Sequence, residues 1–153
     1  MTYAVPRSVV QAFYKAYAAR DIARVADFVA DDVVWTISGP VDVLSFCGTC
    51  HGKDAALDMI GRKISDVYRV VGFEPHAMLV DGEWAATFVR LSARMNDGER
   101  MVSYRLAHFL RFRDDKIVEA QAIIDSYDAA EQVLGHHLGS EHDAEPDKEL
   151  VAV

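Results

Sequence analysis

The chain has 153 residues, of which 51% are hydrophobic and 26% are charged, a balance typical of one soluble globular domain. Its formal net charge of −8 argues against nucleic acid or an anionic membrane surface as a partner, because both bind clustered Lys and Arg. About half of this negative excess lies in residues 139–153, GSEHDAEPDKELVAV, which we expect to form an acidic solvated tail after a domain of residues 1–138.

Nothing in the sequence predicts insertion into a membrane or export. No stretch of about eighteen uncharged apolar residues occurs, so no membrane span is expected. The first residues, MTYAVPRSVVQAFYKAYAARD, lack the basic lead, apolar block and cleavage site of a secretory signal. We therefore expect a cytoplasmic protein.

The first part of the chain is predicted to be mainly helical. Apolar residues recur at helical spacing from Pro6 to Arg20, and Pro6 suits a first turn. Asp21 suits the N-cap of a second short helix, whose apolar positions extend from Ile22 to Val29. The β-branched run VVWTIS, Val33 to Ser38, predicts a strand that a Gly-Pro step ends. An irregular loop follows, and a third helix is expected over about residues 54–65.

From about residue 67 to residue 124 the chain is predicted to form sheet. The expected strands cover residues 67–80, 84–95, 100–113 and 116–124. The Asp-Gly pairs at 81–82 and 97–98 predict hairpins, because glycine adopts positive φ at little cost. A closing helix is expected in SYDAAEQVLGHHLG, with Gly135 or Gly139 near its end. Helices followed by an antiparallel meander predict an α+β fold.

Alternation along residues 100–113 separates two faces of the predicted sheet. We expect one face to pack against the helices, and its residues are Tyr104, Leu106, His108, Leu110 and Phe112. His108 is therefore expected alone among apolar neighbours. If both Asp-Gly turns have two residues, Thr87 lies opposite His108 and His76 lies opposite Thr87, which predicts a row of three residues across the sheet.

Residues 47–51, CGTCH, fit the C-x-x-C-H pattern of covalent haem attachment. Haem attachment requires an export that the N-terminus does not indicate, and a zinc site would lack a convincing fourth ligand. A redox pair of Cys47 and Cys50 requires a geometry that lowers a thiol pKa. The interpretation we favour is that both cysteines are small side chains in a loop over a pocket, so no cofactor and no metal is expected.

Three stretches of the chain resemble the SnoaL-like branch of the nuclear transport factor 2-like superfamily, which also includes ketosteroid isomerase. They are VVQAFYKAYAARDIARVADFVADDVVWTISGP, FCGTCHGKDAAL and LAHFLRFRDDKIVEAQAIIDSYDAAEQVLG. The resemblance covers roughly residues 8 to 138. The loop positions that match the family are Phe46, Gly48, Thr49, Gly52 and Ala55, so the cysteines and His51 occupy variable positions.

The resemblance implies a conical fold, in which a curved antiparallel sheet wraps around three N-terminal helices, a short helix ends the domain, and a deep apolar pocket remains. In ketosteroid isomerases a carboxylate base on the first strand moves a proton, and a Tyr and a protonated Asp bind the oxyanion. The corresponding positions here are Ile37, Phe13 and His108, so the usual base is absent. Near Ala122, where some relatives have a carboxylate, this chain also has none.

The expected catalytic residues are His108, as a general acid or base or a donor to a ligand carbonyl, and Tyr17. The expected ligand-binding residues are Phe13, Trp35, Ile37, Ile60, His76, Thr87, Val89, Leu106, Leu110 and Ile124. The alternative for His108 is a neutral core histidine bonded to a hydroxyl such as that of Thr87 or Tyr17.

Two functions remain open from the sequence. One is a small cofactor-independent enzyme that isomerises, cyclises or dehydrates a modest apolar, carbonyl-bearing molecule by proton transfer. The other is a non-catalytic binding module for such a ligand. The outer sheet face is expected to expose Phe88, Phe109 and Ile123 beside charged residues. Such a patch, together with the resemblance to relatives that commonly pair through this face, predicts a symmetric homodimer.

Overall fold

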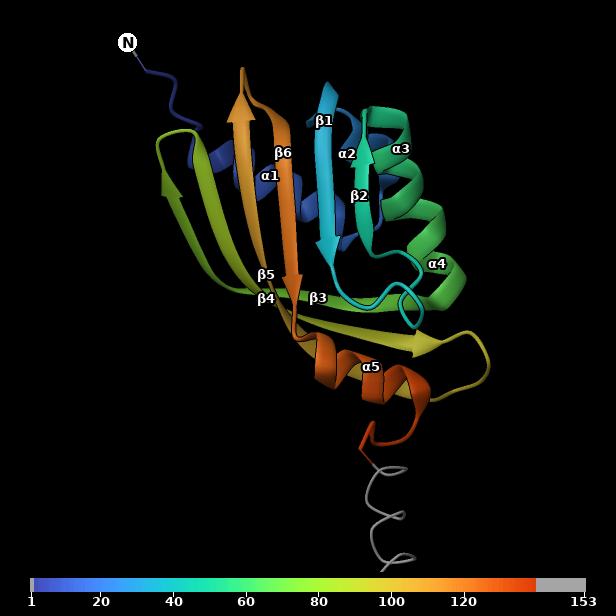
Figure 1. The fold of residues 1–153 in the computed structure, drawn as a ribbon. Coiled ribbons are helices and arrows are strands. Elements are labelled where there is room, and N and C mark those ends of the chain that lie inside the picture. The colour runs from blue at the N-terminus through green and yellow to red at the C-terminus, as the bar shows by residue number, and fades with distance from the viewer. Residues whose placement is uncertain (1, 140–153) are drawn as a thin grey trace, which may run out of the picture.

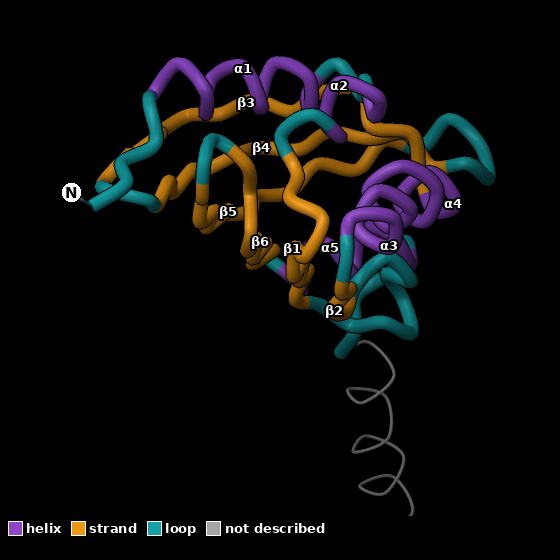
Figure 2. The backbone as a smooth tube through the Cα atoms, turned by 90° about the horizontal axis from the view of Figure 1, so that it is seen from above, coloured by secondary structure: helices purple, strands orange, loops and turns teal. Residues whose placement is uncertain are grey.

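The computed structural model describes residues 2–139, which form a curved six-stranded sheet with helices on its inner side (Figure 1). The expected acidic tail, apart from Gly139, lies outside the described residues. The strand order is β2-β1-β6-β5-β4-β3, and the α+β cone that the sequence predicts is confirmed. Seen from above, α1 and α2 cover one side of the curve and α3 and α4 lie next to β2 (Figure 2).

The helical segments are α1 Arg7–Ala18, α2 Ile22–Ala26, α3 Lys53–Asp58, the π-helical turn η1 Met59–Lys63, α4 Ile64–Val67 and α5 Ser126–Leu134. The strands are β1 Val29–Ser38, β2 Gly48–His51, β3 Tyr68–Asp81, β4 Trp84–Met95, β5 Met101–Arg113 and β6 Lys116–Ile124. The predicted bounds of β4 and β6 are confirmed to the residue. No helix in residues 2–139 is both long enough and apolar enough to cross a membrane.

The helix ends follow local sequence. Pro6 stands at the N-cap of α1, and the Asp21 side chain accepts a hydrogen bond of 3.1 Å from the Arg24 backbone N–H at the start of α2. Gly135 ends α5 in the left-handed conformation, with φ of 80°, which glycine adopts without a Cβ penalty. The predicted third helix is confirmed, but a π-helical turn interrupts it, and the Arg20 guanidinium donates to the Ile60 carbonyl there.

Of the C-x-x-C-H residues only Cys47 lies in a loop as expected, because residues 48–51 form the short edge strand β2. This strand pairs antiparallel with β1, and the Thr36 and Thr49 hydroxyls across the pair are 3.0 Å apart. A strand of four residues is too short to show the alternation by which strands are recognised from sequence. On its other side β1 pairs in parallel with β6.

The predicted strand register is right on one side of Thr87 and wrong on the other. Thr87 lies opposite His108, as expected. His76 does not lie opposite Thr87, because the β3–β4 turn is formed by Gly82 and Glu83 and Met78 occupies that position. A register shift between Pro75 and Ala77 further leaves His76 unpaired on an exposed bulge.

Candidate functional site

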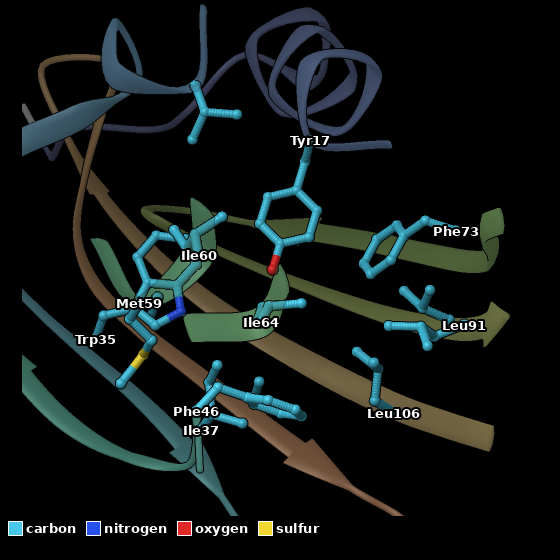
Figure 3. Close-up of a cluster of buried hydrophobic side chains, with 14 of the residues drawn as sticks. Tyr17, Trp35, Ile37, Phe46, Met59, Ile60, Ile64, Phe73, Leu91 and Leu106 are labelled. Carbon is cyan, nitrogen blue, oxygen red and sulfur yellow. The ribbon is translucent and has the colours of Figure 1, made fainter. Parts of the chain in front are cut away.

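The candidate site is the interior of the cone, between α1, η1 and the inner face of the sheet (Figure 3). The strand registers place Ile37 opposite Ala122, Ala122 opposite His108 and His108 opposite Thr87. The positions that correspond to the carboxylate base and the oxyanion-binding Asp of ketosteroid isomerases therefore lie in one row of the sheet, with strand β6 between them. In this chain the first is Ile37 and the second is His108.

His108 is held by α1. Its Nδ1 atom lies 3.1 Å from the Tyr14 hydroxyl, and the two rings stack with centroids 5.8 Å apart. The histidine is 3% exposed, and this burial lowers its pKa to about 4, because the charged form loses its hydration. The imidazole is therefore neutral at neutral pH. Its Nε2 atom makes no hydrogen bond within residues 2–139.

The expected hydroxyl partners of His108 were Thr87 and Tyr17, and the structure gives Tyr14 instead. Tyr17 contacts the imidazole through its ring, edge to face, with centroids 5.7 Å apart. Burial raises the pKa of Tyr14, and Thr87 beside its hydroxyl opposes this shift. Among the described residues, the buried Thr87 Oγ1 atom has no hydrogen-bond partner of good geometry. Phe73 completes the surroundings at 5.7 Å from the imidazole.

Two further polar groups lie inside the cone, the Tyr17 hydroxyl and the Trp35 indole nitrogen. The Tyr17 ring is parallel to the Trp35 indole, with centroids 6.5 Å apart. In Figure 3 the Tyr17 hydroxyl points away from α1 into the cluster, and the Trp35 indole nitrogen points into the same space. The Trp35 Nε1 atom is buried and has no hydrogen-bond partner in the part of the chain that the structure describes. No hydrogen bond of the Tyr17 hydroxyl is found among the described residues either.

The remaining predicted lining residues share one core. Seven of them are buried in the same cluster: Phe13, Ile37, Ile60, Val89, Leu106, Leu110 and Ile124. Their contact with a ligand stays a prediction. His76 is the exception, since it is exposed on the β3 bulge. These lining residues are nearly inaccessible to water, so the interior is closed and packed in this structure.

Four residues of this interior were not among the predicted site residues. Tyr14 and Phe73 surround His108, and the Tyr68 and Tyr104 hydroxyls hydrogen-bond to each other deeper in the cone. Tyr104 could have been found, because it shares the predicted inner face of β5 with His108. Tyr14 could not, because its pairing depends on how α1 packs over β5.

The two cysteines are free and buried. The Cys50 Sγ atom lies 3.9 Å from the Met59 Sδ atom, and burial raises the pKa of the Cys47 thiol to about 11. A redox pair needs the opposite shift, because the thiolate is the reactive form. Within residues 2–139, no three His, Cys, Asp or Glu side chains gather as a metal site would require.

A hollow outside the cone has a different character. About 580 Å³ in volume, it is lined by the start of β1, by Lys53 and by the β5–β6 hairpin. Its charges are mixed, and Arg113 is already paired with Asp32 at 3.0 Å. Such a solvated, self-compensated surface offers no defined chemistry.

A curved mixed sheet closed by helices, with its few buried polar groups inside, is the architecture of the cone-shaped α+β proteins. The sequence profile of the SnoaL-like domain family matches residues 10–120. The chain belongs to this family. No curated protein sequence matches it at a significant level.

Solved structures resemble the chain over most of its length. A candidate isomerase from Rhodopseudomonas palustris is 29% identical, covers 83% of this chain and 93% of its own, and gives a TM-score of 0.72. A nuclear transport factor 2-like protein from Burkholderia thailandensis E264 is 21% identical, with coverage of 84% and 96% and a TM-score of 0.73. An LEH-like epoxide hydrolase of M. tuberculosis is 20% identical, with coverage of 90% and 95% and a TM-score of 0.64.

Proposed function

We propose that the protein binds a small apolar molecule with a carbonyl group inside the cone and moves a proton on it without a cofactor. The observation that carries this proposal is His108, a neutral imidazole fixed at Nδ1 by Tyr14 and unpaired at Nε2. Within residues 2–139 no Asp, Glu, Lys or Arg side chain is buried in the interior, so His108 is the basic group available there. The likeness to a candidate isomerase supports the same chemistry.

The low pKa of His108 does not exclude the role of a base. A conjugate acid with a pKa of about 4 makes this imidazole about as basic as a carboxylate. The base of ketosteroid isomerase is a carboxylate of similar strength, and it works because the enolate that it forms is stabilised by nearby hydrogen-bond donors. The same condition applies to His108, and the Tyr17 hydroxyl is the donor that we assign to the enolate oxygen.

The hydrogen bonding around His108 suits a base at Nε2. If Nδ1–H donates to the Tyr14 oxygen, Nε2 carries a free lone pair. In this arrangement Nε2 takes the proton from the carbon between a carbonyl and a double bond, and the electron pair of that C–H bond enters a dienolate. Nε2–H then returns the proton to the far carbon of the dienolate, which moves the double bond into conjugation. No oxidant, reductant or metal enters this balance.

A non-catalytic binding protein is the second candidate. Ile37 and Ala122 favour it, because both positions that could place a carboxylate beside His108 are apolar and buried. In that case His108 presents Nε2–H as a neutral donor to the ligand carbonyl, and no proton is transferred.

The test uses cyclohex-3-en-1-one, whose conversion to the conjugated enone is followed by ultraviolet absorbance. We expect His108→Gln to keep binding of the ketone and to lower the isomerisation rate by roughly 100-fold or more, the usual contribution of a general base. His76→Gln is the matched control, because it removes an exposed histidine outside the cone. Equal rates in His108→Gln and the wild type would overturn the catalytic role. Binding that needs His108, with no turnover in any variant, would establish the binding protein instead.

We also propose that the protein is a homodimer through the outer sheet face. Phe88, Phe109 and Ile123 are 41%, 41% and 49% exposed on neighbouring strands, and a contiguous exposed apolar patch is typical of a partner surface. The ion pair of Arg111 and Glu119, at 3.1 Å, lies beside the patch and is placed to form part of a polar rim.

A further inference from the structure

Trp35 carries a polar atom that the protein itself does not use. The residue lies on the inner face of β1 and is 1% exposed, yet its Nε1–H has no hydrogen-bond partner within residues 2–139. Buried polar groups in native proteins are almost always paired, so such an exception calls for an explanation. An indole N–H only donates, so its missing partner must be an acceptor.

A second donor without a hydrogen-bond partner among the described residues, the Tyr17 hydroxyl, lies next to it. The Tyr17 hydroxyl comes from α1 and the Trp35 indole from β1, and their rings are parallel at 6.5 Å. Figure 3 shows the hydroxyl and the indole nitrogen directed into the same part of the interior. Burial raises the pKa of Tyr17, so its hydroxyl keeps its proton at neutral pH and remains a donor.

The Tyr17 ring contacts both the Trp35 indole and the His108 imidazole. The Tyr17 ring meets the imidazole edge to face at 5.7 Å and lies parallel to the indole. A small ligand in contact with Tyr17 can therefore reach a basic nitrogen on β5 and two donors from β1 and α1. The wall next to these donors is apolar, formed by residues such as Ile64, Phe46 and Leu106 (Figure 3).

We propose that Trp35 Nε1–H and the Tyr17 hydroxyl together bind the carbonyl oxygen of the ligand. This inference rests on the proposed function, and it adds the requirement that the ligand presents a bare acceptor oxygen, as a ketone or an enolate does. An alcohol or amine would gain less, because its own proton would find no acceptor there. The acid–base group and the oxygen-binding donors thus occupy the reverse of the positions that ketosteroid isomerases imply: the base is on β5, and a donor is on β1.

The experiment compares cyclohexanone with methylenecyclohexane, which has nearly the same shape and no acceptor oxygen. The chain has two Trp residues, so its ¹⁵N spectrum contains two indole N–H signals. On titration with cyclohexanone we expect the Trp35 signal to move downfield and the signal of Trp84, on the outer face, to stay. Methylenecyclohexane should not produce the downfield shift.

Substitutions give a second readout. Trp35→Phe removes the N–H and keeps a buried ring, and we expect it to weaken cyclohexanone binding by roughly three- to tenfold, the effect of one neutral hydrogen bond. Binding of methylenecyclohexane should not weaken in parallel. Trp84→Phe is the matched control, with unchanged affinities, and a melting temperature for Trp35→Phe near that of the wild type would show that the fold is intact.

The outcomes separate this inference from the proposed function. If cyclohexanone binds and His108→Gln affects turnover, but the Trp35 signal does not move, the Trp35 role is overturned and the His108 role stands. If the Trp35 signal moves and His108→Gln leaves turnover unchanged, the oxygen site stands and His108 is not the base. If neither probe binds, or Trp35→Phe weakens both probes equally, the oxygen site is overturned.

Discussion

The two faces of strands β4, β5 and β6 differ in how far their polar groups are buried from water. On the inner face His108 is buried among aromatic rings, is neutral, and hydrogen-bonds with the Tyr14 hydroxyl. On the outer face Arg111 is charged, contacts the Trp84 ring at 6.0 Å and pairs with Glu119 in partial contact with water. The same alternating segments thus build a packed, low-dielectric interior on one side and a hydrated surface on the other. A charge costs little outside and much inside, so the polar groups that remain inside are the best candidates for function.

The sharpest test of this contrast is a carboxylate placed on either face at neighbouring positions of β6. Ala122 is buried next to His108, whereas Gln121 is exposed. We expect Ala122→Asp to lower the free energy of unfolding by on the order of 3 kcal/mol, because the carboxylate is buried, and Gln121→Asp to change it by less than about 0.5 kcal/mol. Urea unfolding at pH 8 measures both.

Ala122→Asn separates the cost of charge from the cost of size. We expect it to be less destabilising than Ala122→Asp at pH 8, with the difference shrinking at pH 5 as the carboxylate takes up a proton. Similar stabilities for the Asp variants at 121 and 122 would contradict a sealed inner face.

The pH dependence of stability tests the burial of His108 in the same interior without introducing a charge by mutation. The unfolded chain binds a proton at His108 with a pKa near 6.5, and the folded protein does so only at about 4. The contribution of the neutral His108 to the free energy of unfolding is therefore fully present above about pH 6.5. This contribution is lost as the pH falls towards 4. The loss amounts to about 3 kcal/mol over that range.

Two histidine variants isolate this contribution from the carboxylates that titrate in the same range. As the pH falls, the free energy of unfolding of His108→Gln should decrease less than that of the wild type, by about this amount, since glutamine does not titrate. His76→Gln should keep the wild-type profile. Urea unfolding at a series of pH values from 7 to 4.5 provides the measurement, and parallel profiles for the wild type and His108→Gln would contradict a buried neutral imidazole.

Much of the contrast between the faces could be predicted from the sequence, because alternation and hairpin turns are local. They place His108 on the inner face and Thr87 opposite it, and both are confirmed. The prediction for His76 failed because it depended on a turn one residue out of place and on a bulge that leaves no mark in the alternation. Errors of this kind accumulate with each strand crossed.

The partners of the inner polar groups could not be predicted, since they depend on contacts between distant elements. Tyr14 reaches His108 only because of the way α1 lies across β5, 94 positions along the chain. The unpaired Trp35 Nε1 becomes visible only when the whole interior is assembled. A sequence indicates which side chains face inward, but not which of them remain without a partner there.

The smallest expected effect concerns the outer face, where the substitution should leave the fold of one subunit nearly unchanged. Ile123→Asp puts a carboxylate in the middle of the exposed apolar patch, beside Ala107 and near Phe88. We expect the unfolding free energy of the subunit to change by less than about 1 kcal/mol and the dimer dissociation constant to rise by roughly tenfold or more, because the charge would lose its water in the interface. Light scattering over a range of tens of micromolar distinguishes monomer from dimer. Val41→Asp is the control, since Val41 is 54% exposed in the β1–β2 connection rather than on the sheet face. A wild-type protein that is monomeric throughout this range, or an Ile123→Asp variant as dimeric as Val41→Asp, would leave the outer face as a hydrated surface without a partner copy.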